Sequence, residues 1–243
     1  MKKILTINNL SKNYHTIDNE IPAIKDLSME VYENEILAIV GPSGCGKSTL
    51  LSILANLENK TSGDIIKENN TKIGYMLQTD SLFPWLTVLE NSCIGIKDKK
   101  NINDVIKLLD KYGLSEFKNS YPSSLSGGMR QRVALIRTLG INPDILLLDE
   151  PFSALDYQTR LALSNDMYKM IKNEKKTVIL ITHDIAEAIS MADRVIVLTK
   201  RPCKVKKIYE IKLDNKTNPI DNRKDKNFNY YYDMIWRDLD VNI

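Results

Sequence analysis

Residues 36–49 read ILAIVGPSGCGKST and decide the fold of the chain. The five apolar residues 36–40 have the length and composition of a strand that is buried on both faces of a sheet. Residues 41–48 fit the pattern G-x-x-x-x-G-K-[ST], and an apolar helical pattern follows from Leu50 to Leu57. Glycines let successive backbone N–H groups point at one anion, and the start of a helix adds its positive end. The stretch therefore predicts a strand, a phosphate-binding loop and a helix.

The loop supplies most of the nucleotide-binding residues that we expect. Lys47 can reach the outer phosphates of ATP, and Ser48 can offer its hydroxyl to Mg²⁺. Cys45 lies beside Lys47 at a helix start, a setting that lowers the pKa of a thiol and predicts a reactive, ATP-protected cysteine. The alternative is a glycine-rich turn with a chance lysine, which the strand before it and the helix after it disfavour. The predicted set is Gly41, Pro42, Ser43, Gly44, Cys45, Gly46, Lys47, Ser48 and Thr49.

A second apolar run ends in two acids, because residues 145–150 read ILLLDE. A strand end that is merely solvated is the simpler explanation for this segment alone. Beside a phosphate-binding loop, Asp149 would hold Mg²⁺, mostly through water, because magnesium retains part of its hydration shell. Glu150 points to the other side of the strand, where its carboxylate can polarise an attacking water.

The rest of the chain fits a mixed α/β fold. Unbroken apolar runs at 36–40, 145–148, 177–182 and 194–198 alternate with helical patterns, which predicts a largely parallel sheet covered by helices. The apolar residues of 4–7 and 27–31 alternate instead, as they do in half-exposed antiparallel strands. Residues from about 82 to 139 are mainly helical and predict an inserted helical subdomain.

The C-terminal part looks different from the rest. Residues 215–227 are polar and charged, so we expect a linker there, followed by a short helix. Phe228, Tyr231, Ile235 and Leu239 share one face of that helix. Packing of this face against the parent domain is the simplest interpretation.

Composition limits the classes of function. The 243 residues are 43% hydrophobic and 27% charged, as in an ordinary folded protein, and no apolar run approaches the roughly 18 residues of a membrane span. The first ten residues lack the pattern of a signal peptide, and the three cysteines are widely spaced, so we expect a cytosolic chain. A net charge of +3 is too weak to indicate nucleic acid as a partner.

A second glycine-containing helix start lies about twenty residues before Asp149. Residues 125–132 read LSGGMRQR, so that Ser126 and two glycines open a helix without any lysine equivalent to Lys47. Two phosphate-facing helix starts with one lysine between them suggest a nucleotide that is shared by two copies of the chain. With these motifs in this order, the chain resembles the ATPase subunits of ATP-binding cassette (ABC) transporters, whose signature residues 125–129 match.

The resemblance covers essentially the whole chain and implies its fold and organisation. The fold is that of a P-loop NTPase, an ABC-type nucleotide-binding domain with an N-terminal antiparallel β-subdomain and an inserted α-helical subdomain. We expect this ATPase domain to occupy residues 1–214, with the helical subdomain at about 82–139. Residues 215–243 would be the polar linker and the short C-terminal helix.

The resemblance also implies roles for individual residues. Gln78 would contact Mg²⁺ and sense the membrane subunit, and Asp156 would communicate across the dimer. His183 would be the switch histidine near the γ-phosphate, although a histidine after an apolar strand is otherwise more often structural. Tyr14 would stack on adenine, although many surface tyrosines look alike. The signature residues that would act on the partner's nucleotide are Ser126, Gly127, Gly128 and Met129.

One departure from the broad family points to a branch within it. Met129 stands where glutamine is usual, and residues 78–88, 149–156 and 200–202 are similar to the importer branch for nitrate, sulfonates, taurine and pyrimidine precursors. This implies an Mg²⁺-dependent ATPase at the cytoplasmic face of the membrane, working as a homodimer with permease subunits and, indirectly, an extracytoplasmic solute-binding protein.

Two other functions remain open at this point. One is a non-transport ATPase, mechanical or acting on nucleic acid, on the same cassette. Its DNA-repair members carry a long coiled coil between the two motifs, whereas Lys47 and Ser126 are only 79 positions apart, and its translation-associated members carry two cassettes, whereas this sequence shows one. An export cassette on the same fold is the other alternative. The sequence does not name the solute. Residues 82–86, LFPWL, have two readings as well: Phe83 and Trp85 are either core of the helical subdomain or part of a groove for a helix of the permease.

Overall fold

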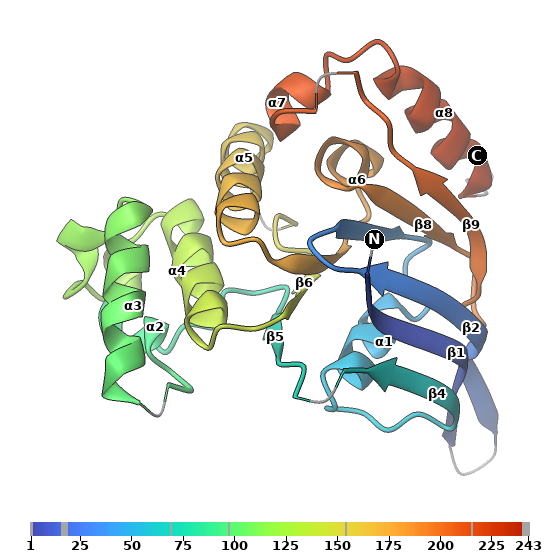
Figure 1. Ribbon diagram of the computed structural model, residues 1–243, viewed down its shortest axis with the longest axis horizontal. Helices are drawn as coiled ribbons and strands as arrows, with labels where there is room; N and C mark the ends of the chain where they lie inside the picture. The colour runs from blue at the N-terminus through green and yellow to red at the C-terminus, as the bar shows by residue number, and fades with distance from the viewer. Residues whose placement is uncertain are drawn as a thin grey trace.

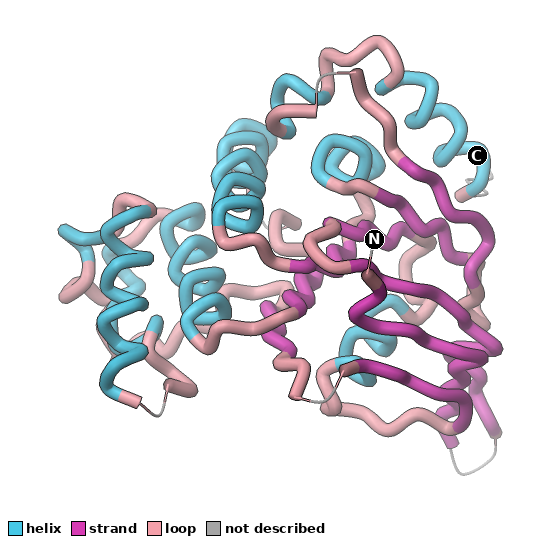
Figure 2. The backbone as a smooth tube through the Cα atoms, in the orientation of Figure 1, coloured by secondary structure: helices cyan, strands magenta, loops and turns pink. Residues whose placement is uncertain are grey.

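A computed structural model describes residues 2–15, 19–68, 70–96, 98–153, 155–214 and 216–239. Two sheets organise the chain (Figures 1 and 2). The smaller sheet is antiparallel, in the order β2 (Glu20–Tyr32), β1 (Lys3–His15), β4 (Ser62–Lys67). This confirms the antiparallel N-terminal region that the alternating apolar residues predict.

The larger sheet contains the four buried strands expected from the sequence. Its order is β5 (Ile73–Met76), β6 (Ile145–Asp149), β7 (Thr177–Ile181), β3 (Ile36–Val40), β8 (Arg194–Leu198), β9 (Val205–Glu210). The first five strands are parallel, and β9 pairs antiparallel with β8. Every residue of β3, β6 and β7 is buried, which explains why their sequences are apolar without alternation.

The larger sheet separates two hydrophobic cores. On one face, Leu37, Ile39 and Leu147 pack with residues of β1, β2 and α1 (Lys47–Leu54). On the other face, Ala38, Leu146 and neighbouring residues pack with α4 (Gly127–Gly140), α5 (Tyr157–Asn173) and α6 (Ile185–Met191). Figure 1 shows α1 between the two sheets and α5 and α6 on the opposite side. The phosphate-binding loop and the signature helix therefore belong to different cores.

A helical lobe lies to one side of both sheets, on the left in Figure 1. It contains α2 (Val88–Ser92), α3 (Lys99–Lys111), the 3₁₀ turns η1 (Ser115–Phe117) and η2 (Pro122–Ser124), and α4. Helix α4 connects the lobe to the rest of the chain, because it contacts α2 and α3 on one side and α5 and β5 on the other. The predicted helical character of this region is confirmed.

The C-terminal segment is more firmly attached than a linker. Residues 219–222 form the short helix α7 (Pro219–Asn222), and the fully buried Asn222 side chain donates to the carbonyl oxygen of Ser190 at 2.7 Å. Lys216 pairs with Asp193 at 2.6 Å. The prediction of a polar linker is amended here, because its polar groups bind partners on α6 and just before β8. Residue 215 and residues 240–243 of the predicted C-terminal segment lie outside the described residues.

Helix α8 (Phe228–Asp238) packs as its apolar face predicts. Phe228 and Ile235 are buried in the core that also contains α4, α5 and α6, and the partly buried Tyr231 and Leu239 pack against the same core. The division of the chain into residues 1–214 and 215–243 stays a prediction.

Candidate nucleotide site

The phosphate-binding loop curves tightly between β3 and α1. Gly44 and Gly46 have φ angles of +71° and +124°, which side chains with a Cβ rarely adopt. A Cβ at Gly46 would also lie only 3.0 Å from the carbonyl oxygen of Ala23. Both observations explain why the motif needs glycine at these places. The loop lines a cavity of about 220 Å³ whose residues are Ser43, Gly44, Gly46, Lys47, Ser48, Thr49, Glu150 and Arg201.

Lys47 is held inside the loop. Its ammonium donates to the carbonyl oxygens of Gly41 at 2.8 Å and Pro42 at 3.0 Å, and the residue is only 6% exposed. Such a lysine is positioned in advance, and it can exchange these neutral carbonyl oxygens for the oxygens of a phosphate.

Asp149 faces the start of α1. Ser48 Oγ donates to Asp149 Oδ1 at 3.4 Å, and the Tyr75 hydroxyl donates to Oδ2 at 3.1 Å. Burial raises the pKa of Asp149, and the hydrogen bonds from Ser48 and Tyr75 oppose this only in part. A cation at this carboxylate would offset the cost of its burial, and hydroxyl and carboxylate oxygens are ligands that Mg²⁺ accepts. The side chains present therefore fit a magnesium ion that also binds water and a phosphate.

Glu150 lies at the centre of a polar cluster. Its Oε2 is 3.0 Å from His183 Nδ1 and 3.5 Å from Gln78 Nε2. Gln78 also donates to Ser153 Oγ at 3.3 Å. The backbone of Glu150 has a φ of +44°, a left-handed conformation that is uncommon for a residue with a side chain. A backbone conformation of this kind is frequent at functional sites.

The order of the strands brings these residues together. Gln78 follows β5, Asp149 and Glu150 end β6, and His183 follows β7, while the phosphate loop follows β3. These are four consecutive strands of the sheet, all parallel, so that their carboxyl ends meet at one edge.

Tyr14 lies beside the start of α1. Its hydroxyl is 3.4 Å from Thr49 Oγ1, and the ammonium of Lys12 lies 4.8 Å from the centre of its ring. The ring is 38% exposed. The structure thus places Tyr14 next to the loop with one part of its ring accessible.

The signature residues lie apart from this cluster. Ser126 caps α4, and its side chain accepts a hydrogen bond from Met129 N at 3.3 Å. Among the described residues, no hydrogen bond or ion pair joins Ser126, Gly127, Gly128 or Met129 to the phosphate loop. Within the described residues, the start of α4 is therefore not bonded to the start of α1.

Asp156 caps the next helix. Its carboxylate accepts from Gln158 N and Thr159 N, and the Thr159 hydroxyl with these N–H groups holds the pKa of Asp156 below its usual range. Ala154, in the same predicted loop, lies outside the described residues.

Cys45 differs from its prediction. The Cys203 thiol beside it lowers the pKa of Cys45 to about 6, in the predicted direction. The residue is only 2% exposed, however, and it belongs to the core under the loop together with Cys203. The expectation of an accessible, reactive cysteine is wrong, because its side chain points away from the cavity into the protein.

Several polar residues in or near the site were missed in the sequence. Arg130 pairs with Asp80 at 2.9 Å, and Arg137 donates to the carbonyl oxygens of Asp80 and Ser81, both at 2.8 Å. Helix α4 thereby fixes the segment that follows Gln78. The only signal for this was the basic run after the signature glycines. Tyr75, Arg160 and Glu187 gave no signal of their own.

The segment 82–87 presents two aromatic side chains to solvent. Phe83 is 41% and Trp85 is 68% exposed, and their ring centroids are 5.2 Å apart. Beneath them, the fully buried Asn91 side chain accepts from Phe83 N and donates to the carbonyl oxygens of Phe83, Leu86 and Thr87. The turn is thus built around Asn91, and the interpretation of Phe83 and Trp85 as core is wrong.

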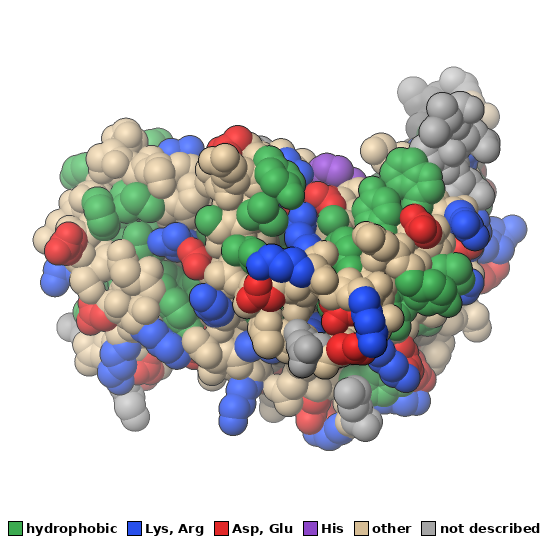
Figure 3. Space-filling view, turned by 90° about the horizontal axis from the view of Figure 1, so that it is seen from above, with side chains coloured by type: hydrophobic (Ala, Val, Ile, Leu, Met, Phe, Trp, Pro, Cys, Tyr) green, Lys and Arg blue, Asp and Glu red, His purple; other side chains and the backbone are tan. Residues whose placement is uncertain are grey.

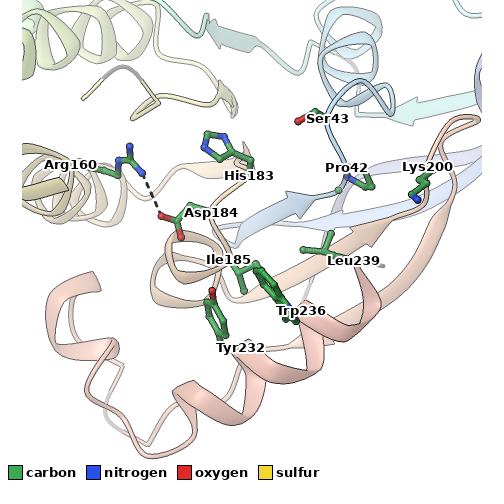
Figure 4. A pocket seen from close by; sticks show the side chains of 11 residues that line it. Pro42, Ser43, Arg160, His183, Asp184, Ile185, Lys200, Tyr232, Trp236 and Leu239 are labelled. Atoms are coloured by element: carbon green, nitrogen blue, oxygen red, sulfur yellow. Dashed lines mark ion pairs between the residues drawn. The ribbon is translucent and has the colours of Figure 1, made fainter. Parts of the chain in front are cut away.

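A larger cavity of about 510 Å³ lies on the other side of the phosphate loop (Figure 4). Pro42 and Ser43 form one wall, His183 and Asp184 another, and Tyr232 and Trp236 of α8 a third. Arg160 points toward Asp184 across this space.

Two general properties of the described residues bear on the class of protein. No helix among them combines the length and apolarity that crossing a membrane requires. On the face shown in Figure 3, Lys and Arg are interspersed with Asp and Glu, without a basic stripe that would suit nucleic acid.

Comparison with known proteins gives a consistent result. The profile of the ABC transporter family matches residues 24–153. The chain is 40% identical to the uncharacterized ABC transporter ATP-binding protein YtlC of Bacillus subtilis, over 97% of this chain and 95% of that one. It is 39% identical to the aliphatic sulfonates import ATP-binding protein SsuB of Bacillus cereus, with 86% of each chain covered.

Among solved structures, the dimeric post-hydrolysis state of the ATP-binding cassette MJ0796, bound to ADP and Pi, superimposes with a TM-score of 0.72. The two sequences are 33% identical, and the alignment covers 86% of this chain and 99% of that one.

Proposed function

Because the chain belongs to the ABC transporter family and is an ATP-binding protein of it, we propose that it hydrolyses ATP to drive uptake of a small solute through separate permease subunits. The observation that carries this proposal is the Glu150 carboxylate, held between Gln78 and His183 at the edge of the phosphate loop. An acid in this position would serve hydrolysis, because the attacking water needs a base beside the phosphates.

The phosphates of ATP would lie in the cavity above the loop. Backbone N–H groups at the start of α1 would donate to them, and Lys47 would leave the carbonyl oxygens of Gly41 and Pro42 to neutralise the outer phosphates. The exposed part of the Tyr14 ring would stack on the adenine.

Ser48, Asp149 and Gln78 would hold the magnesium ion, which fits the buried carboxylate of Asp149 described above. When bound, Mg²⁺ neutralises charge that develops on the phosphates during hydrolysis. Tyr75 would keep the Asp149 carboxylate oriented through its 3.1 Å hydrogen bond.

Glu150 would orient and deprotonate the attacking water. Glu150 Oε2 contacts Gln78 Nε2 and His183 Nδ1. A water that takes the place of one of these two groups would bind to Oε2 and be oriented by the remaining group. His183 would donate to the γ-phosphate from the same side. In the present arrangement His183 contacts Glu150, so ATP binding would require it to turn toward the phosphate.

A second copy would complete the site. The chain places Ser126, Gly127, Gly128 and Met129 apart from its own phosphate loop, and the relative MJ0796 is described as a dimer. In a dimer, the signature of each copy would bind the nucleotide held by the other. Asp156 would then lie in the loop that meets the partner.

The permease would bind at the exposed aromatics. Phe83 and Trp85 protrude from the turn before α2. Tyr121, which is 51% exposed, follows Ser120, whose carbonyl oxygen accepts from Val88 N at the start of α2. A helix of the permease would use these rings as anchors. Arg130 and Arg137 hold residues 80 and 81, so a displacement of this surface on permease binding would be transmitted to the segment after Gln78.

The relative SsuB is named for the import of aliphatic sulfonates, which supports an importer of small solutes and, by extension, an indirect functional partnership with a solute-binding protein. Through the permease, the chain would be held at the cytoplasmic face of the membrane.

ATPase assays of the purified chain with Mg²⁺ test the catalytic part of this proposal. Glu150→Gln should retain ATP binding and lose turnover by roughly 10²–10⁴-fold, as expected when a general base is removed. Glu174→Gln is the matched control, because Glu174 lies at the C-terminal end of α5 and its carboxylate pairs with Lys111 of α3. A Glu150→Gln variant with more than a tenth of normal activity would exclude Glu150 as the base.

The transport part is tested by co-expression of the chain with a permease and a solute-binding protein of the aliphatic sulfonate importer class. Uptake of aliphatic sulfonates that depends on Glu150 would support the sulfonate class. Uptake of no small solute by the intact assembly would refute the importer.

A further inference from the structure

Arg160 lies on the first turn of α5, four residues after Asp156, and lines the cavity that also contains His183 (Figure 4). Its side chain is 22% exposed. Neither nucleotide binding nor hydrolysis, as described above, uses this residue.

On one side, Arg160 contacts the loop that precedes α5. Its NH2 group donates to the carbonyl oxygen of Leu155 at 3.1 Å. Leu155 and Asp156 are the residues that would meet the second copy, so the position of this carbonyl oxygen depends on how that loop is placed.

On the other side, Arg160 faces two acids that follow His183 in the chain, Asp184 and Glu187. Its NH1 is 3.6 Å from Asp184 Oδ2, and its Nε is 3.8 Å from Glu187 Oε1. Figure 4 shows the guanidinium directed at Asp184, with the imidazole of His183 beside it.

These acids fix the backbone on both sides of the histidine. Asp184 Oδ1 accepts from Ala186 N at 2.7 Å and caps α6. The buried Glu187 accepts from the hydroxyl of Thr182 at 2.6 Å, and Thr182 Oγ1 in turn accepts from Asp184 N at 3.0 Å. Thr182 and Asp184 are the chain neighbours of His183, so any shift of the acids moves the imidazole.

The contacts of Arg160 leave room for adjustment. Its Nε is buried without a hydrogen-bond partner among the described residues, and both distances to the acids exceed normal hydrogen-bond length. A small displacement of the loop would therefore shorten or lengthen these contacts. Buried ionic contacts respond strongly to such displacements, because water screens them little.

We propose that Arg160 is a positioning residue that sets the place of His183 according to the position of the loop at Leu155 and Asp156. Contact of a second copy with that loop moves the guanidinium, and the acids carry the shift to the histidine. This inference rests on the proposed function, because it assumes that His183 acts in ATP hydrolysis.

A double-mutant cycle tests the proposal. Arg160→Met should lower the kcat for ATP about tenfold while the KM stays within twofold, because the histidine is misplaced and the phosphate loop is intact. In a His183→Ala background the same change should have no further effect on kcat. Equal fold losses in both backgrounds would show that Arg160 acts independently of His183 and would overturn the proposal.

The cycle also separates this inference from the proposed function. If His183→Ala alone leaves kcat unchanged, the role assigned to His183 fails, whatever Arg160 does. Arg194→Met is the matched control: Arg194 also donates to a backbone carbonyl oxygen, that of Glu30, and pairs with a buried acid, Glu35, at the opposite end of the sheet. It should leave kcat per folded molecule unchanged.

Two further measurements keep the test decisive if Arg160→Met folds poorly. Arg160→Lys retains the charge, but an ammonium cannot span the carbonyl oxygen and both acids, so kcat should still fall about threefold. A normal kcat in Arg160→Lys would overturn the proposal. The chain has only two histidines, so its imidazole NMR signals are simple: both Arg160 variants should shift the signal of His183 and leave that of His15 in place. An unshifted His183 signal would also overturn it.

Discussion

Removal of the Phe83 ring tests the assignment of the exposed aromatic segment to the permease-binding surface. Phe83 is 41% exposed and its backbone is fixed by Asn91, so Phe83→Ala removes a ring without removing the hydrogen bonds of the turn. Phe152, which is 1% exposed, is the matched control for a ring in the closed core.

The structure gives the expected size of both effects. Full burial of a phenylalanine side chain contributes about 2–3 kcal/mol, and Phe83 has about three-fifths of that burial, so Phe83→Ala should lower the free energy of unfolding by about 1–2 kcal/mol. For a chain of this size, the melting temperature should fall by about 2–8 °C. Phe152→Ala leaves a closed cavity and should cost about 3–5 kcal/mol.

Phe83→Ala should affect binding to the permease more than it affects the stability of the chain. An aromatic anchor is worth about 2 kcal/mol, so Phe83→Ala should weaken association with the detergent-solubilised permease about 30-fold. ATP hydrolysis by the isolated chain should stay normal. Thermal unfolding and a titration of the labelled permease measure the two quantities. Normal affinity in the Phe83→Ala variant, or a loss of stability equal to that of Phe152→Ala, would refute the assignment of this surface.

Three other predictions concern the nucleotide site. Mixed dimers with Lys47→Ala in one copy and Ser126→Arg in the other should keep one intact composite site and close with ATP. In a homodimer of either variant both sites are damaged, so equal closure of the mixed dimer and the homodimers would refute the shared site. Maleimide should label Cys45 and Cys203 only after unfolding in urea, since they are 2% and 0% exposed; rapid labelling of the folded chain, read by mass spectrometry, would contradict their burial. Burial raises the pKa of Asp149 above its ordinary 3.8. Without Mg²⁺, the folded chain therefore binds more protons than the unfolded chain between pH 3.8 and the raised pKa. The free energy of unfolding should fall as the pH rises from 3.8 through the raised pKa. Asp149→Asn should reduce this slope in urea titrations; an unchanged slope would assign it to other groups.

Sequence patterns predict the buried strands better than the edges of the sheets. Strands β3, β6 and β7 are buried on both faces, so their apolar runs stand out. Strand β5 has only four residues and includes Gly74, and β9 is a largely exposed edge strand in which only Tyr209 is buried, so neither has a pattern of its own. Pairing with a neighbour, which a single sequence does not display, makes them strands.

The candidate site divides in a similar way. Gly44 and Gly46 were predictable because the local backbone conformation demands glycine, and Lys47 because it belongs to the same contiguous motif. Arg160 and Glu187 were not, since an arginine on a helix and a glutamate near a helix start usually face solvent. Their importance follows from α5 and α6 lying side by side, which is a property of the folded chain. Cys45 shows the reverse error: its neighbours in sequence suggested its chemistry, and its neighbours in space remove its access.

The sheet that separates the two cores has a consequence for how this chain tolerates change. Lys47 and Ser48 begin a helix that packs into one core, whereas the segment after Gln78 and the signature helix are supported by the other. Substitutions in the core around α4 would change how the chain responds to a membrane partner. They would leave the start of α1, and with it nucleotide binding, unchanged. Under the proposed function, such a chain would adapt to a different permease through the core around α4 and keep its nucleotide site unchanged.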